Sequence, residues 1–145
     1  MAVELFRAVD CLQHSGSDPE FPVLEVRARE PLFRREKTFS APIDTGFGGY
    51  LLVPKDLYAE LGTMELPRED FGVYSTMAGS VTLRRSEVKI SVGDKELDTF
   101  IETPLHGTGK TLLGRRILSE LDLALLGRKR MCCHLRPVRK AKTNR

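Results

Sequence analysis

Asp44 is the residue whose type and setting most suggest chemistry. It opens the tripeptide Asp44-Thr45-Gly46, which follows Ile43 at the end of a strand-like segment and leads into the glycine-rich bend 46–49. By itself the tripeptide is weak evidence for a catalytic site, because Asp, Thr and Gly together often form a simple turn. A carboxylate at the junction of a strand and a bend can nevertheless act as a general base toward water. Asp44 is therefore the first candidate for a catalytic residue.

A second segment, Leu112-Leu113-Gly114, places two aliphatic residues and a glycine before a predicted helix. In this order, the two segments resemble those of the retropepsin-like aspartic peptidases, the family that includes the retroviral proteases. The resemblance covers residues 23–135. It implies that Asp44 is catalytic, that Thr45 and Gly46 complete the active-site loop, and that the Leu-Leu-Gly segment passes beneath this loop.

The resemblance also implies a flap, a hairpin that covers the substrate. By position alone, the flap corresponds to the glycine-containing turn formed by Met77, Ala78, Gly79 and Ser80. Its substrate would be an extended peptide or protein segment.

A single Asp-Thr-Gly supplies only half of such an active site. Peptide hydrolysis without a metal needs one carboxylate to activate water and one carboxylic acid to protonate the carbonyl. In aspartic proteases two neighbouring carboxylates share one proton, because like charges so close together do not both ionise. We therefore expect a homodimer with Asp44 from each chain, working without a cofactor or metal. The alternative is a dimeric peptide- or protein-binding module of the same fold that lacks useful turnover.

Two positions depart from the family's pattern. Retroviral enzymes typically place an acid two residues after the glycine of the motif, where it meets an arginine. Here that position is Gly48, whereas Arg115 is present, so Arg115 lacks the partner that the resemblance implies. Phe47 stands where a small residue is common, and either narrows the neighbouring pocket or covers the core.

Residues 104–111 form a competing motif. They match the phosphate-binding Gly-x-x-x-x-Gly-Lys-Thr loop except at Pro104, which replaces the first glycine. Proline removes a backbone donor, and the chain after Thr111 is too short for the remainder of a nucleotide-binding fold. A metal site at Cys132-Cys133-His134 is also disfavoured, because successive side chains of a strand point to opposite faces. We expect residues 104–111 to form a loop near the active-site cleft instead of a phosphate-binding site.

The elements that must position Asp44 are mostly strands. Short alternating or apolar runs separated by glycine predict a mainly β fold, a closed barrel or sandwich of short antiparallel strands with one or two short helices. The resemblance makes this fold half of a pepsin-type fold. The predicted strands are 21–29, 38–43, 50–53, 71–76, 81–83, 86–92 and 97–101. An apolar segment follows at 111–114, the helices are at 54–61 and 115–121, and 123–126 and 131–135 form a terminal hairpin.

Composition limits the classes of protein to which the chain can belong. The chain has 145 residues, 41% of them hydrophobic and 30% charged, and no apolar run long enough to cross a membrane. An acidic residue, Glu4, stands where a signal peptide would be basic, so a cytoplasmic location is expected. We divide the chain into an N-terminal segment (1–20), one peptidase domain (21–136) and a basic, disordered tail (137–145). Residues 128–145 hold eight Lys or Arg and no acid, but without interleaved aromatic residues this tail does not favour nucleic acid as a partner.

Overall fold

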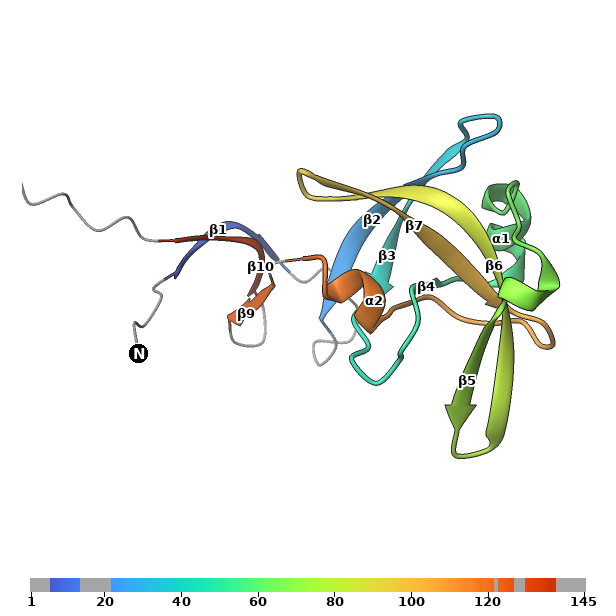
Figure 1. The fold of residues 1–145 in the computed structure, drawn as a ribbon. Coiled ribbons are helices and arrows are strands. Elements are labelled where there is room, and N and C mark those ends of the chain that lie inside the picture. The colour runs from blue at the N-terminus through green and yellow to red at the C-terminus, as the bar shows by residue number, and fades with distance from the viewer. Residues whose placement is uncertain (1–5, 14–21, 122, 127–129, 138–145) are drawn as a thin grey trace, which may run out of the picture.

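The structure is a computed structural model, and it describes residues 6–13, 22–121, 123–126 and 130–137. Strands dominate these ranges and form two sheets (Figure 1). The larger sheet has seven strands in the order β3-β2-β6-β7-β4-β8, with β5 paired to β6. Its strands are β2 (Val23–Arg29), β3 (Glu36–Pro42), β4 (Leu51–Leu52), β5 (Gly72–Thr76), β6 (Gly79–Val92), β7 (Lys95–Pro104) and β8 (Leu112–Leu113). The mainly β fold class is thereby confirmed.

Buried apolar residues alternate with exposed residues along β2, which explains why this segment forms a strand of the sheet. Leu24, Val26 and Ala28 are fully buried, whereas the residues between them are exposed. This pattern buries one face of the strand and leaves the other in solvent. β2 pairs antiparallel with β3 and with β6, so the first predicted hairpin is confirmed.

The sheet is mixed rather than wholly antiparallel. β4 runs parallel to β7 and antiparallel to β8. An isolated parallel bridge between Ile43 and Leu113 then joins the two outer strands of the sheet, β3 and β8. Parallel neighbours need a long connection between them. The chain from α1 (Lys55–Leu61) through the β5–β6 hairpin supplies it.

Three local expectations need correction. Segments 81–83 and 86–92, which were expected as two strands, belong to one continuous strand, β6, in which Arg84 and Arg85 pair with Glu65 and Glu102. The second helix, α2 (Arg115–Leu118), is shorter than expected, and a 3-10 turn, η1 (Arg68–Asp70), precedes β5. Gly62 ends α1 at φ −85°, so its role there is close approach to the Tyr58 carbonyl and not a left-handed conformation.

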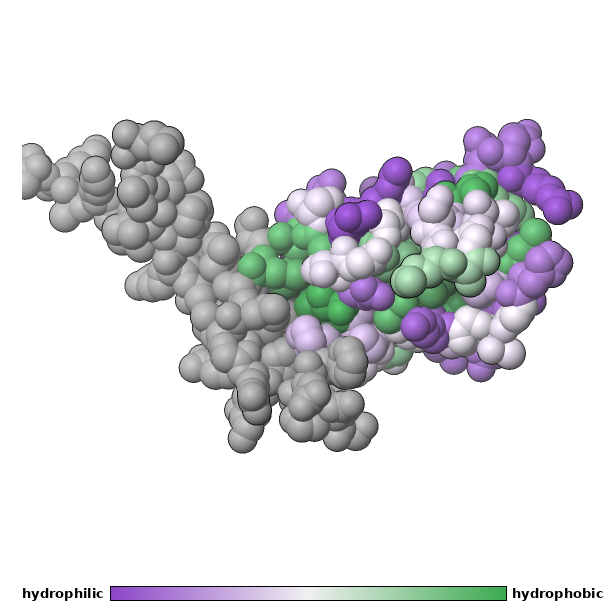
Figure 2. All heavy atoms as spheres, turned by 90° about the horizontal axis from the view of Figure 1, so that it is seen from below, coloured by the Kyte–Doolittle hydropathy of each residue, from purple (hydrophilic) through white to green (hydrophobic). Residues whose placement is uncertain are grey.

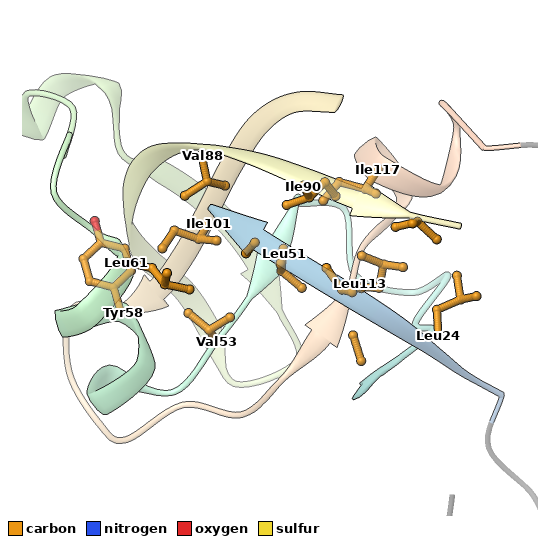
Figure 3. Packing of buried hydrophobic residues seen from close by; sticks show 14 of the residues in the cluster. Leu24, Leu51, Val53, Tyr58, Leu61, Val88, Ile90, Ile101, Leu113 and Ile117 are labelled. Atoms are coloured by element: carbon orange, nitrogen blue, oxygen red, sulfur yellow. The ribbon is translucent and has the colours of Figure 1, made fainter. Parts of the chain in front are cut away.

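The core lies between the curved sheet and the two helices (Figure 3). Leu51 of β4, Ile101 of β7 and Leu113 of β8 are fully buried and come from three adjacent strands. Ile117 of α2 packs into the same cluster. The strands that flank Asp44 are therefore anchored in the core, where truncating one large aliphatic side chain typically costs about 2–5 kcal/mol.

The smaller sheet joins the two ends of the chain. It has the order β1-β10-β9, with β1 (Phe6–Gln13) antiparallel to β10 (Arg130–Pro137) and β10 antiparallel to β9 (Ala124–Leu126). Figure 1 shows it to one side of the larger sheet. The terminal hairpin was expected, whereas β1 was not. None of the helices in the described ranges has the length and apolar character that crossing a membrane requires.

Candidate active site

The backbone around Asp44 is held by three hydrogen bonds. The Asp44 N–H donates to the Leu113 carbonyl at 3.0 Å, directly after the Ile43–Leu113 bridge. The Asp44 carboxylate accepts the Gly46 N–H at 2.9 Å, and its carbonyl accepts the Phe47 N–H at 3.2 Å. These contacts make a tight turn that fixes the carboxylate at the end of β3. Asp44 is half-buried, whereas Thr45 and Gly46 are exposed.

The Leu-Leu-Gly segment lies against this turn. Leu112 and Leu113 form β8, and the Gly114 N–H donates to the Tyr50 carbonyl at 2.7 Å. A Cβ on Gly114 would overlap the carbonyl group of Gly49, so only glycine allows this approach. The two segments singled out in the sequence are therefore adjacent in the structure.

The predicted flap residues lie at the end of the β5–β6 hairpin. Met77 and Ala78 form its turn, and Gly79 and Ser80 begin β6. Gly79 adopts φ 113°, a conformation that favours glycine, and the Thr76 hydroxyl donates to its carbonyl at 2.7 Å. Figure 1 shows this hairpin projecting from the rest of the sheet.

The face toward which the hairpin projects carries apolar side chains among polar ones (Figure 2). On the hairpin itself, Val73, Met77 and Val81 are exposed large hydrophobic residues. Exposed apolar side chains on a projecting hairpin are suited to covering a bound chain.

Comparison with solved structures identifies the architecture. The chain is similar to the EIAV protease complexed with the inhibitor HBY-793, with a TM-score of 0.53 and 17% sequence identity, over 73% of this chain and 92% of that chain. The fold is retropepsin-like. No protein-family model matches the chain, and no curated protein sequence matches it.

Within this retropepsin-like fold, the departures at Gly48 and Arg115 meet in space. The Arg115 Nη2 atom lies 2.9 Å from the position that a Cβ on Gly48 would take. Among the residues that the structure describes, no carboxylate pairs with the Arg115 guanidinium. The guanidinium therefore occupies the place where it would meet an acid at position 48, if one were present.

Phe47 packs inside the loop. Its ring centroid lies 5.4 Å from that of Tyr74 on β5, and its edge covers Gly49 and Gly114, where added Cβ atoms would collide with it. The ring thus fills the space that the two glycines leave, which agrees with the interpretation that Phe47 covers the core.

A buried carboxylate behind the active-site loop escaped the sequence analysis. Glu102 on β7 is fully buried, and its Oε1 accepts the Tyr50 N–H at 2.7 Å. Its Oε2 accepts the Tyr74 hydroxyl at 2.7 Å and pairs with Arg85 at 3.2 Å. Burial and the hydrogen bond to Glu102 raise the pKa of Tyr74 to about 12. An isolated Glu inside a strand gives no sequence signal for such a cluster.

The glycine-rich segment 105–111 is a loop between β7 and β8. It leads into the two-residue strand β8, whereas a phosphate-binding loop opens a helix whose N–H groups face the phosphates. The Lys55 side chain and N–H donate to the carbonyls of Leu105 and Thr108. The loop is thus tied to α1, and the nucleotide-binding alternative gains no support.

In the described part of the chain, no group of three or more His, Cys, Asp or Glu side chains lies close enough together to bind a metal ion. His14 lies outside the described residues, as do the side chains of Cys132, Cys133 and His134. The expectation of a disordered tail from residue 137 also falls almost wholly outside them.

Proposed function

We propose that the chain is an aspartic endopeptidase whose active site is completed by a second copy of itself. One observation carries the proposal: in a retropepsin-like fold, the Asp44 carboxylate stands at the end of β3, with its backbone bonded to Leu113 of β8. Of the residues described, only the Gly46 N–H donates to this carboxylate. Most of its acceptor capacity is left for water, substrate or a second carboxylate.

In the proposed dimer, the two Asp44 carboxylates share one proton. The ionised carboxylate takes a proton from a water molecule, whose oxygen attacks the carbonyl carbon of the peptide bond. The protonated carboxyl gives its proton to the carbonyl oxygen. When the tetrahedral intermediate breaks down, the amide nitrogen receives a proton and leaves as an amine. This chemistry requires neither a cofactor nor a covalent intermediate.

Thr45 and the flap have roles in the same proposal. Thr45 is exposed, and its hydroxyl has no hydrogen-bond partner within the described ranges of a single chain. Across a twofold axis it would reach the opposite active-site loop. Met77 at the tip of the β5–β6 hairpin is fully exposed, so it can close over an extended peptide.

The test is incubation of the purified protein with a peptide library from about pH 3 to about pH 8, compared with Asp44→Asn. The Asn side chain keeps the shape of Asp but cannot act as the base, so cleavage is expected from the wild type alone. Activity should follow a bell-shaped pH profile, because only the singly protonated pair has both an acid and a base. Equal cleavage by Asp44→Asn would sink this mechanism. Peptide capture by the wild type without cleavage would instead favour the binding-module alternative.

A further inference from the structure

Two carboxylates in the described part of the chain are fully buried, Glu30 and Glu102. Glu30 serves one turn: its oxygens accept the N–H groups of the residues that follow it, together with the Thr63 hydroxyl. Glu102 differs, because its partners come from three separate elements. A buried charge is costly unless every acceptor is used, so the arrangement of partners shows what the group holds together.

The partners of Glu102 lie next to the active-site loop and on the flap hairpin. Tyr50 lies between the active-site loop and β4, and its N–H donates to Oε1 at 2.7 Å. Tyr74 lies on the first strand of the flap hairpin, and its hydroxyl donates to Oε2 at 2.7 Å. Arg85 lies on the second strand of the hairpin, and its Nη2 donates to Tyr74 at 3.0 Å and to Glu102 at 3.2 Å. One carboxylate therefore bonds to the loop and to both strands of the hairpin.

Two glycines let the backbone approach this carboxylate. A Cβ on Gly49, in the active-site loop, would lie 2.5 Å from Glu102 Oε1. A Cβ on Gly72, at the start of β5, would lie 2.7 Å from Oε2. Real Cβ atoms do not come so close to oxygen, so both segments pack on the carboxylate only because they lack side chains there.

Aromatic contacts reinforce the same connection. The Arg85 guanidinium lies 5.1 Å from the Tyr50 ring centroid, and the Tyr74 ring contacts that of Phe47, which follows Gly46. Cation–π and aromatic pairs of this kind add to the attraction between the segments that carry them. The hairpin and the loop are thus joined by a polar contact and an apolar contact side by side.

We propose that Glu102 is a positioning residue that fixes the flap hairpin relative to the active-site loop. It makes no hydrogen bond to Asp44 and acts through the Tyr50 N–H and the Tyr74 hydroxyl. The consequence for catalysis rests on the proposed function, whereas the mechanical coupling between hairpin and loop does not. If the hairpin is released, a peptide is held less firmly over the loop, so KM should rise. A loss of folded protein alone would lower apparent kcat and leave KM unchanged.

The first experiment measures the coupling without substrate. Amide hydrogen exchange is followed in the wild type, Glu102→Gln, Tyr74→Phe and Glu30→Gln. In the two cluster variants, exchange should speed up by about tenfold or more both at the Tyr50 amide and along β5. Glu30→Gln, the matched control at the other buried carboxylate, should affect the turn at residues 30–35 and leave these two sites unchanged. Tyr74→Phe removes one hydroxyl, so it gives an answer even if Glu102→Gln does not fold.

The second experiment measures peptide cleavage by the same variants. Tyr74→Phe and Glu102→Gln should raise KM, with kcat/KM lower by about tenfold to a hundredfold, and the double variant should lose little more than either single one. Unchanged KM in both, or exchange that rises at Tyr50 but not along β5, overturns the positioning role. If the wild type cleaves nothing while the cluster variants release both segments together, the peptidase proposal fails and the coupling stands.

Discussion

Three carboxylates in this chain have different environments, for which we propose different roles. Glu30 and Glu102 are fully buried, and their acceptor sites are filled by several donors. Asp44 is half-buried, with the Gly46 N–H as its one donor among the described residues. A buried carboxylate whose acceptor sites are all filled by hydrogen-bond donors has a structural role. A carboxylate that acts as a general base must instead keep acceptor sites free for water or substrate.

The Glu30 carboxylate should make stability depend on pH. Burial raises its pKa, but the hydrogen bonds from Thr63 and from the N–H groups of Arg35, Phe33 and Leu32 outweigh this and lower the pKa from 4.5 to about 2. A lowered folded-state pKa contributes stability that is present above pH 4.5 and lost as the pH falls toward about 2.

Glu30→Gln should therefore lower the free energy of unfolding at neutral pH. The gap between wild type and variant should narrow in urea unfolding experiments as the pH falls from about 5 to about 2. Glu69→Gln, an exposed acid on η1, is the control and should show almost no gap. A gap for Glu30→Gln that stays constant over this range would contradict the role given to its charge.

Gly48→Asp tests the empty place beside Arg115. Gly48 does not need a positive φ, and the nearest obstacle to a Cβ is the end of the flexible Arg115 side chain. The new carboxylate should pair with the guanidinium and raise the free energy of unfolding by about 0.2–1 kcal/mol, less in high salt. The measurement is urea unfolding in low salt and in about 1 M salt, with Gly48→Asn as the uncharged control. Equal stability of the Asp and Asn variants would show that no pair forms.

At the scale of elements, the sequence was sufficient where a pattern is local. The β2–β3 hairpin, the β5–β6 turn and α1 follow from alternation, glycine and proline, and each is present. The parallel pairing of β4 with β7 and the addition of β1 to β10 depend on partners far away in the chain, for which a single sequence has no signal. Such pairings are decided by tertiary packing.

The residues of the candidate site also differ in whether a local motif predicts them. Asp44 and the Leu-Leu-Gly segment were found because they belong to two motifs of fixed type. Glu102 was not found, because its partners Tyr50, Tyr74 and Arg85 stand 52, 28 and 17 positions away and share no motif with it. Only the folded arrangement shows that β7 contributes to the site.

Gly114→Ala tests how closely β8 must approach the active-site loop. The added methyl group would overlap the backbone of Gly49, which cannot move without displacing the loop. The variant should lose about 1–3 kcal/mol of unfolding free energy, measured by urea unfolding, together with peptide cleavage. Gly48→Ala is the matched control, because its methyl group meets only a movable side chain, and it should change stability little. If both variants were equally stable, the packing between loop and β8 would not be tight.

At the scale of the whole molecule, the basic C-terminal tail should be dispensable. Residues 138–145 lie outside the described part of the chain, and they hold four Lys or Arg residues and no acid. A segment of this composition does not form core. A chain truncated after Pro137 should retain its melting temperature and its cleavage of short peptides. Unfolding of the truncated chain would refute this.

The single chain supplies one Asp-Thr-Gly and one Leu-Leu-Gly segment, which is half of the proposed site. Each active molecule should therefore need an intact Asp44 from both chains. This requirement can be tested by mixing, because an Asp44→Asn chain should fold and dimerise normally while contributing no second carboxylate.

The most direct measurement is the activity of wild-type chains mixed with a ninefold excess of differently tagged Asp44→Asn chains, after exchange of subunits. If chains pair at random, about one wild-type chain in ten keeps a wild-type partner. Peptide cleavage per wild-type chain should then fall to about a tenth of its unmixed value. Copurification through the second tag confirms that mixed dimers have formed. Unchanged cleavage per wild-type chain in the presence of these mixed dimers would show that one Asp44 suffices, and the shared active site would be wrong.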